Sequence, residues 1–119
     1  MTLINYSEPI NYKLLEQYRE LLGNDGVAHS LTTLETLIPD YMAELETLNG
    51  TQQEPELRRQ AHKVKGACRS LGFVRLGEAM HFLERDSWTW PQVDAVLHQS
   101  ELWLTDDLEE VKRWLKESN

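Results

Sequence analysis

The sequence predicts an all-α protein, an antiparallel four-helix bundle with an additional short N-terminal helix. Leucine occurs 19 times, whereas valine and isoleucine together occur nine times, and β-branched side chains are the ones that favour strands. Apolar residues recur at spacings of three and four, which places them on one face of a helix. Short connections between long amphipathic segments are typical of antiparallel neighbours.

The chain is expected to form a single domain. Its 119 residues, of which 40% are hydrophobic, are enough for one compact core and too few for two ordinary domains. We expect the domain to cover residues 1–119 and its core bundle to cover about 25–117.

The amino-terminal half predicts two helices. The first covers residues 11–22, with Asn11 as its cap and Gly23 as its end. The second covers about 25–48. A kink or a break is expected at Pro39 within it, because proline lacks the amide hydrogen that the helix needs. Its apolar stripe consists of Leu31, Leu34, Ile38, Tyr41, Leu45 and Leu48.

Three further helices are predicted in the rest of the chain. One starts near Glu54–Pro55, since proline is favoured in a first turn, and ends at Gly72. The next covers about 73–83. The last opens at Thr89-Trp-Pro-Gln92, which matches a capping box. The apolar stripes of these three helices are Leu57, Ala61, Val64, Cys68 and Leu71; Phe73, Leu76, Met80 and Leu83; and Val93, Leu97, Leu104, Leu108, Val111 and Leu115.

Charge is distributed unevenly along the chain. The net charge is −8, yet six cations between residues 56 and 75 accompany a single acidic residue, so this segment carries +5 and the rest −13. The acidic body excludes nucleic acid as a general partner, because phosphate backbones require a basic surface. The basic segment is a candidate site. Its cations are Arg58, Arg59, Lys63, Lys65, Arg69 and Arg75.

Nothing in the sequence indicates secretion or membrane insertion. The single cysteine, Cys68, cannot form an internal disulfide, and residues 1–13 do not resemble a signal peptide. No run approaches the roughly 20 apolar residues that span a bilayer. We therefore expect a cytoplasmic protein without direct membrane contact.

His62 is predicted to face solvent. At about 100° per residue, its direction lies about 140° from the middle of the apolar sector of helix 54–72. Five neighbours lie within about 60° of it, namely Arg58, Arg59, Lys65, Gly66 and Arg69. A surface histidine on a charged helix usually has no function, so the pattern of its neighbours decides the interpretation.

That pattern suits a phosphoryl acceptor. A neutral imidazole is a competent nucleophile near pH 7, since the reference pKa of histidine is about 6.5. Lys65, three residues after His62, is placed to stabilise the negative charge of a transferring phosphoryl group. Gly66 leaves room for a partner. Glycine within a helix costs about 1 kcal/mol relative to alanine, so a glycine at this position indicates a function for the missing side chain. The alternative is close packing against another helix. The position of Gly66 on the polar face of its helix argues against that alternative.

The run Ala61-His-Lys-Val-Lys-Gly-Ala-Cys-Arg-Ser-Leu-Gly72 is similar to the signature of histidine-phosphotransfer (HPt) domains. That signature has a lysine and a glycine three and four residues after the histidine, then small residues and an aliphatic–glycine pair. Segments 14–23 and 38–41 resemble the carboxyl-terminal HPt domains of Arc-type and Tor-type hybrid sensor kinases, so the resemblance covers most of the chain. Arg69 departs from the pattern, because many members carry a small residue there. It either crowds the site or lies along its rim.

The resemblance implies a function and its partners. His62 would accept a phosphoryl group from a receiver-domain aspartate and pass it to another, the receivers belonging to a hybrid sensor kinase and a response regulator. The divalent metal, magnesium, would be held by the receiver, and this chain would bind no cofactor or metal. The chain would be monomeric as an isolated domain, and the resemblance favours a domain that belongs to an inner-membrane sensor. It would lack ATP-dependent autokinase activity, since it has no nucleotide-binding motif. The residues expected to contact receivers are Arg58, Arg59, Lys63 and Arg69.

Glu84 is a candidate to orient the imidazole. A hairpin turning at Gly72–Phe73 pairs positions whose numbers sum to about 145, which sets His62 opposite Leu83. Leu83 belongs to the apolar stripe, so Glu84 is expected at the edge of the interface. There it either accepts the N–H of one ring nitrogen, leaving the other free to attack, or forms a salt bridge with a nearby cation.

Two other functions stay open at this point. One is a helical docking domain that binds receivers without transferring phosphate. The other is a metal-binding bundle that uses His62, His81 and carboxylates. His81 and Glu84 are only two ligands, which do not make a site, and the cations around His62 would repel a metal ion.

Overall fold

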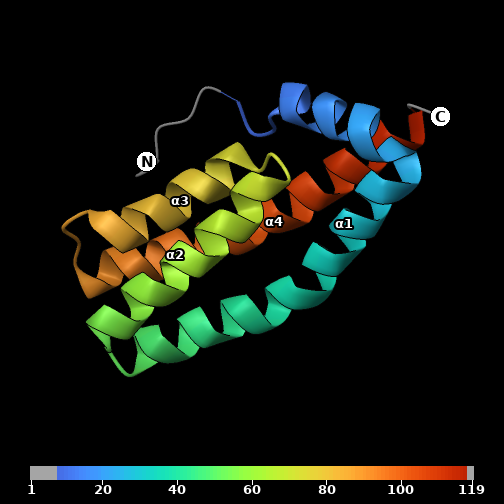
Figure 1. The fold of residues 1–119 in the computed structure, drawn as a ribbon. Helices are drawn as coiled ribbons and strands as arrows, with labels where there is room; N and C mark the ends of the chain where they lie inside the picture. The colour runs from blue at the N-terminus through green and yellow to red at the C-terminus, as the bar shows by residue number, and fades with distance from the viewer. Residues whose placement is uncertain (1–7, 118–119) are drawn as a thin grey trace.

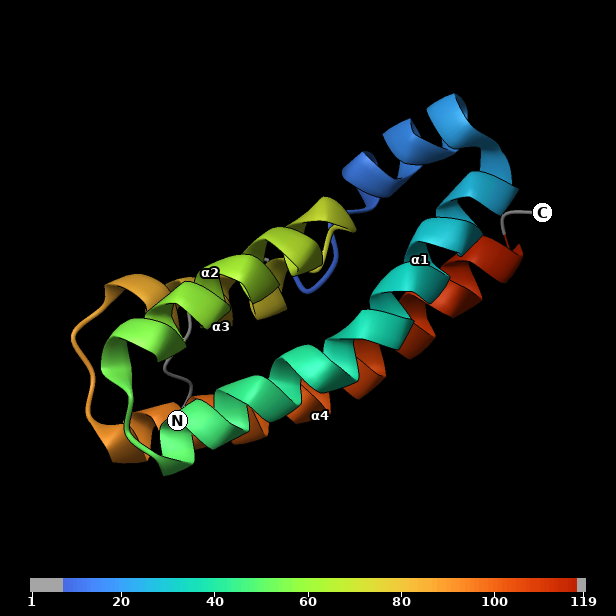
Figure 2. The same cartoon turned by 60° about the horizontal axis from the view of Figure 1, so that its bottom comes forward.

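A computed structural model of the protein describes residues 8–117. It contains the helices α1 (Tyr12–Gly50), α2 (Glu54–Ser70), α3 (Val74–Arg85) and α4 (Trp90–Glu117). Successive helices run in opposite directions, with α1 beside α4 and α2 beside α3 (Figures 1 and 2). Contacts also join α1 to α2 and α3 to α4, which closes the ring. The predicted all-α antiparallel bundle is confirmed.

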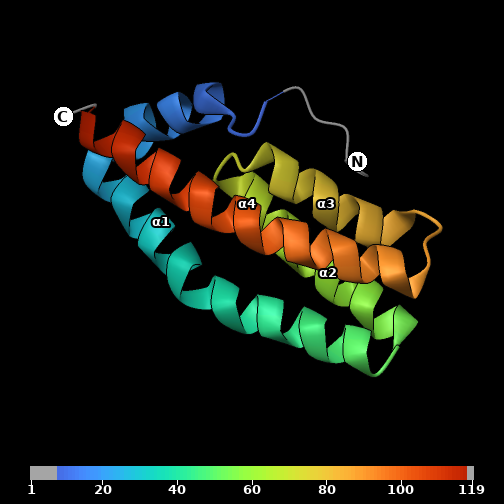
Figure 3. The same cartoon turned by 180° about the vertical axis from the view of Figure 1, so that it is seen from behind.

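The first helix consists of two segments that meet at Gly23. The φ of 73° and ψ of 172° at Gly23 are not helical, and the chain changes direction there (Figure 2). The short segment before it is the predicted N-terminal helix, capped by Asn11, whose Oδ1 accepts a hydrogen bond from the Leu14 amide at 3.1 Å. Figure 3 shows the longer segment running along α4.

Of the kink or break expected at Pro39, the break is wrong. Helix α1 continues through this residue, and only Gly23 within α1 departs from helical dihedrals. Pro39 lies on the exposed face of the helix. The proline ring therefore meets no neighbouring helix, and α1 continues although one backbone hydrogen bond is missing.

A glycine turn joins α2 to α3. The Phe73 amide donates to the Cys68 carbonyl at 3.0 Å and the Gly72 amide donates to the Arg69 carbonyl at 3.1 Å, the two bonds of a Schellman motif. Gly72 has a φ of 78°, and a Cβ there would lie 3.0 Å from the carbonyl oxygen of Asn11. The turn therefore requires glycine, and it sends α3 back along α2.

The last connection is closed by the predicted capping box. The Thr89 amide donates to Gln92 Oε1 at 2.8 Å, and the Gln92 amide donates to Thr89 Oγ1 at 3.4 Å. Two orphan amides at the start of α4 are thereby satisfied. No helix within residues 8–117 combines the length and the apolar content that a membrane span requires.

The predicted stripes of the α2–α3 hairpin form the centre of the core. All nine of their residues are buried, from Leu57 to Leu83. Burial raises the pKa of the Cys68 thiol to about 12, so this cysteine stays a neutral packing group.

The stripes of the flanking helices differ from the prediction. On α1, Met42 is buried and Tyr41 is only half-buried. On α4, Leu104, Leu108 and Leu115 are half-buried, whereas Trp103 and Asp107 are buried. Helix α4 packs against both α1 and α3. Its buried face is therefore broader than the predicted leucine stripe and includes positions outside that stripe.

Candidate functional site

His62 stands on the exposed face of α2, as predicted. Its side chain is 65% exposed, while its neighbours Ala61 and Val64 are buried. The core therefore anchors the backbone on either side of the histidine and leaves the ring accessible to a partner.

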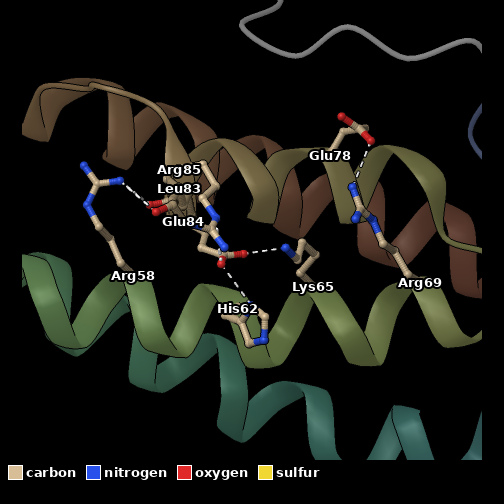
Figure 4. A network of polar contacts seen from close by, with 8 residues as sticks. All are labelled: Arg58, His62, Lys65, Arg69, Glu78, Leu83, Glu84 and Arg85. Carbon is tan, nitrogen blue, oxygen red and sulfur yellow. Dashed lines mark hydrogen bonds and ion pairs between the residues drawn. The ribbon is translucent and has the colours of Figure 1, made fainter.

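Glu84 joins two residues of α2 to the end of α3 (Figure 4). Its Oε2 lies 2.9 Å from His62 Nδ1, and its Oε1 lies 2.5 Å from Lys65 Nζ. Arg85 Nε is 3.1 Å from the same carboxylate. The structure thus combines the two arrangements that the sequence left open for Glu84, a contact with the imidazole and a salt bridge to a lysine.

The charge of Glu84 determines the hydrogen position in its contact with His62. The hydrogen bond from Lys65, followed by that from His62, lowers the pKa of Glu84 to about 2, although burial acts in the opposite direction. A carboxylate can only accept hydrogen bonds. The proton between the two side chains therefore belongs to His62 Nδ1, and in the neutral form of the imidazole the lone pair lies on Nε2.

Lys65 lies against Glu84 between the two helices. Its side chain is only 14% exposed, so the ammonium is held close to His62 and is not a mobile surface group. A preorganised cation stabilises developing negative charge more effectively than a mobile one.

Gly66 faces open space. A Cβ added at this position would meet nothing within 4 Å outside its own helix backbone. Close helix packing, the alternative reason for a glycine here, is therefore absent. One turn beyond His62, the surface of α2 offers no side chain that would obstruct an approaching molecule.

An open pocket of about 440 Å³ adjoins the histidine, lined by Arg58, Arg59, His62, Glu84 and Arg85. The side chains of Arg59 and Arg85 are 71% and 66% exposed. Arg58 is 25% exposed and turns toward the end of α3 (Figure 4). The sequence singled out Arg58 and Arg59 but missed Arg85, which the hairpin register could have placed beside His62.

The other two predicted partner-binding cations point elsewhere. Lys63 Nζ lies 4.6 Å from the ring centre of Tyr41 on α1. Arg69 extends over Gly77, where an added Cβ would meet its Cγ at 2.8 Å, and its Nη2 is 3.0 Å from Glu78 Oε1. Arg69 therefore lies along the rim of the site and does not crowd His62.

The structure brings no set of metal ligands together around His62. Within residues 8–117, no group of three or more His, Cys, Asp and Glu side chains is arranged to hold a metal ion. The neighbours of the ring are the Glu84 carboxylate, which is shared with cations, and the arginines of the pocket.

The sequence and the fold of this chain both have matches among known proteins. The sequence model of the Hpt domain matches residues 28–114. The chain belongs to the Hpt domain family. It is a phosphotransfer module of a phosphorelay, which the comparisons favour over a docking domain without transfer.

The Hpt domain has relatives among sensor proteins. It is 28% identical over 109 residues to the aerobic respiration control sensor protein ArcB of Escherichia coli K12, a match that covers 89% of this chain and 14% of that protein. It is 30% identical over 78 residues to the sensor histidine kinase AruS of Pseudomonas aeruginosa, covering 66% of this chain and 8% of that protein. The chain thus spans a small part of the sensors it matches.

A solved structure shows the same fold. The histidine-containing phosphotransfer domain of ArcB from E. coli aligns with a TM-score of 0.84 and 26% identity, over 92% of this chain and 95% of that one. A solution structure of the same domain aligns with a TM-score of 0.80.

Proposed function

We propose that His62 is the phosphoacceptor of this Hpt domain, taking a phosphoryl group from an aspartate of one receiver domain and passing it to an aspartate of another. The observation that carries the proposal is the contact of 2.9 Å between His62 Nδ1 and Glu84 Oε2 on a ring that is otherwise exposed. It orients the imidazole and directs the free lone pair of Nε2 toward solvent.

The transfer step follows from this geometry. Nε2 attacks the phosphorus of the receiver's phosphoaspartate, a bond forms between Nε2 and phosphorus, and the bond from phosphorus to the aspartate oxygen breaks. The aspartate leaves as a carboxylate, and Nδ1 keeps its proton. The ring becomes positively charged, and the Glu84 carboxylate stabilises that charge, as the acidic member of a catalytic triad does for its histidine. Transfer to the second receiver reverses these events.

Lys65 and Gly66 have supporting roles in the proposal. The Lys65 ammonium stabilises the charge on the phosphoryl oxygens during transfer, which takes place largely through positioning and electrostatics. Gly66 admits the receiver's aspartate close enough for in-line attack. Arg59 and Arg85 supply an exposed positive rim around the same position.

We assign the divalent metal, magnesium, to the receiver. Magnesium prefers oxygen ligands and keeps several waters, whereas the surroundings of His62 hold one carboxylate that is already bound to Lys65 and Arg85. We infer that the receivers belong to a hybrid sensor kinase and a response regulator, since the relatives above are sensor proteins. We further propose that the domain acts as a cytoplasmic monomer without autokinase activity of its own.

The test of this function is a His62→Gln variant incubated with a phosphorylated receiver. We expect no label on the variant and an acid-labile, base-stable label on the wild type. Helical content should be unchanged, because an exposed side chain contributes little to the core. The matched control is His98→Gln, the same change at an exposed histidine of α4.

Each outcome separates the candidate functions. A fully labelled His62→Gln variant would exclude His62 as the acceptor. A wild-type protein that binds the receiver and acquires no label would support the docking domain instead.

A further inference from the structure

Glu84 occupies a position at which a helix normally frays. It is the last residue but one of α3, which ends at Arg85. The final carbonyls of a helix have no amide partners within it, and helix ends are the first parts to open. An oriented His62 requires a fixed Glu84, so something outside α3 has to hold this last turn.

Arg58 of α2 provides that support. Its Nη1 donates to the carbonyl oxygens of Leu83 at 3.3 Å and of Glu84 at 2.9 Å. Trp88 supports the same turn of α3. Its Nε1 donates to the Leu83 carbonyl at 3.0 Å, and its ring centre lies 4.4 Å from the Arg58 guanidinium carbon. Glu54 Oε2 accepts from Arg58 Nε at 3.0 Å, which fixes the guanidinium in turn.

The support and the histidine lie on one face of α2. Arg58, His62 and Lys65 are four and three residues apart, the spacing that stacks side chains along a helix. Figure 4 shows the three reaching across to the same end of α3. Glu84 is therefore held by its backbone carbonyl from one turn of α2 and by its carboxylate from the next.

We propose that Arg58 is a positioning residue for phosphoryl transfer, acting through Glu84 on the imidazole of His62. The proposal rests on the function assigned above. A cation at the carboxyl end of α3 also suits the helix dipole, so the same guanidinium stabilises the turn and holds Glu84. This role differs from that of Arg59, which is 71% exposed and binds Glu56 on its own helix.

The test compares Arg58→Met, Arg58→Lys and Arg59→Met. Nitrogen-15 NMR of the imidazole reports which ring nitrogen of His62 carries the proton, and amide exchange reports opening of the last turn of α3. In Arg58→Met we expect faster exchange at Asp86, whose amide bonds to the Phe82 carbonyl, and a smaller share of the Nδ1–H tautomer. Single-turnover transfer at saturating receiver should slow on the order of tenfold, less than the roughly 100-fold that a displacement of 1 Å costs.

The two other variants narrow the interpretation. Lysine keeps the positive charge but lacks the planar guanidinium, with which Arg58 binds Glu54 through Nε and the two carbonyls through Nη1. Arg58→Lys should therefore recover the transfer rate and the tautomer in part. Arg59→Met removes the same charge from the same pocket and should leave the tautomer and the exchange of Asp86 as in the wild type, even where it weakens association.

A double-mutant cycle with Glu84→Ala decides whether Arg58 acts through Glu84. The effect of Arg58→Met on the tautomer should disappear when Glu84 is already absent. An undiminished effect in that background, or a tautomer that Arg58→Met does not change, would overturn the inference. Both results are independent of the labelling of His62→Gln, which tests the proposed function itself.

Discussion

At the scale of single residues, the Glu84 carboxylate determines the state of the site. It contacts His62, Lys65 and Arg85, and its side chain is only 9% exposed. A carboxylate with these partners stays ionised at neutral pH, which makes it a permanent acceptor for His62 Nδ1. Gly66 contributes through the absence of a side chain, which leaves the surface beside His62 open.

Glu84 should make the stability of the domain depend on pH in a defined window. Its pKa is about 2 in the folded protein, against an ordinary value of 4.5. A lowered pKa contributes stability that is complete above the ordinary value and is lost as pH falls toward the folded value. We therefore expect the free energy of unfolding of the wild type to exceed that of Glu84→Gln near neutral pH and the excess to shrink between about pH 4.5 and pH 2.

Urea unfolding across that range measures this difference. Glu44→Gln, which changes an exposed carboxylate on α1, is the control and should show a smaller dependence. A constant difference between wild type and Glu84→Gln over the whole window would contradict the ion pairs of Glu84.

Gly66→Leu should raise stability and impair transfer. Glycine costs a helix about 1 kcal/mol relative to the best helix formers, and open space at this position means that leucine gains most of that amount without a clash. The same side chain would fill the space that a receiver needs beside His62. Unfolding measurements and single-turnover transfer report the two effects.

Gly66→Ala is the matched variant. It gains helix propensity with a much smaller side chain, so its loss of transfer should be smaller than that of leucine. If Gly66→Leu folds and transfers at the wild-type rate, Gly66 has no part in partner clearance.

At the scale of elements, the α2–α3 hairpin builds the site and a buried ion pair ties it to α4. Arg75, at the start of α3, places Nη2 2.6 Å from Oδ1 of Asp107, a residue that is 2% exposed. Burial raises the pKa of Asp107, and the hydrogen bond from Arg75 acts against that rise. The guanidinium carbon of Arg75 also lies 5.1 Å from the ring centre of Trp103. Arg75 thus belongs to the interior, although it is part of the basic segment in the sequence.

Removing one member of this pair should destabilise the bundle strongly. We expect Arg75→Met to cost about 3 kcal/mol, because it leaves a buried carboxylate without its cation. The double change Arg75→Met with Asp107→Leu should restore most of the loss, since two apolar groups replace the pair. Urea unfolding of the wild type and of these two variants measures the differences. If Arg75→Met is as stable as the wild type, the ion pair contributes nothing to stability.

At the scale of the whole molecule, the charge around His62 opposes the charge of the body. The chain carries −8 in total, yet the pocket beside His62 is lined by three arginines. Such a contrast guides an anionic partner toward one face. A receiver's phosphoaspartate is anionic, and the exposed arginines are therefore expected to act on association more than on the transfer step.

Association with a phosphorylated receiver should slow as salt concentration rises, because exposed charges are screened within about 10 Å at moderate ionic strength. Arg59→Gln should lower the association rate and make it less dependent on salt. The decrease should be part of the roughly tenfold or larger increase in association rate that electrostatic steering supplies. Arg113→Gln removes an exposed charge from α4, which does not pack against α2, and should have little effect. Stopped-flow association rates that are independent of salt would exclude steering.

The helices, their order and the exposed position of His62 follow from the amino-acid sequence alone. Apolar spacing, the Asn11 cap, the Gly72 turn and the Thr89 capping box are local features, and each acts within a few residues of the backbone. The hairpin register likewise predicted that Glu84 lies beside His62. The identity of the histidine as the acceptor and the roles of its neighbours remain predictions from sequence.

The partners of the charged side chains, in contrast, depend on how the helices pack in three dimensions. Arg58, Arg69 and Arg75 look alike in the sequence, yet one caps α3, one lies over Gly77 and one pairs with the buried Asp107. Long side chains choose among acceptors on other helices, and that choice depends on rotamers and on distances of a few ångströms that periodicity does not specify. Helix α1 also continues through Pro39, because packing along the bundle holds both sides of a position at which the residue type alone favours an end of the helix.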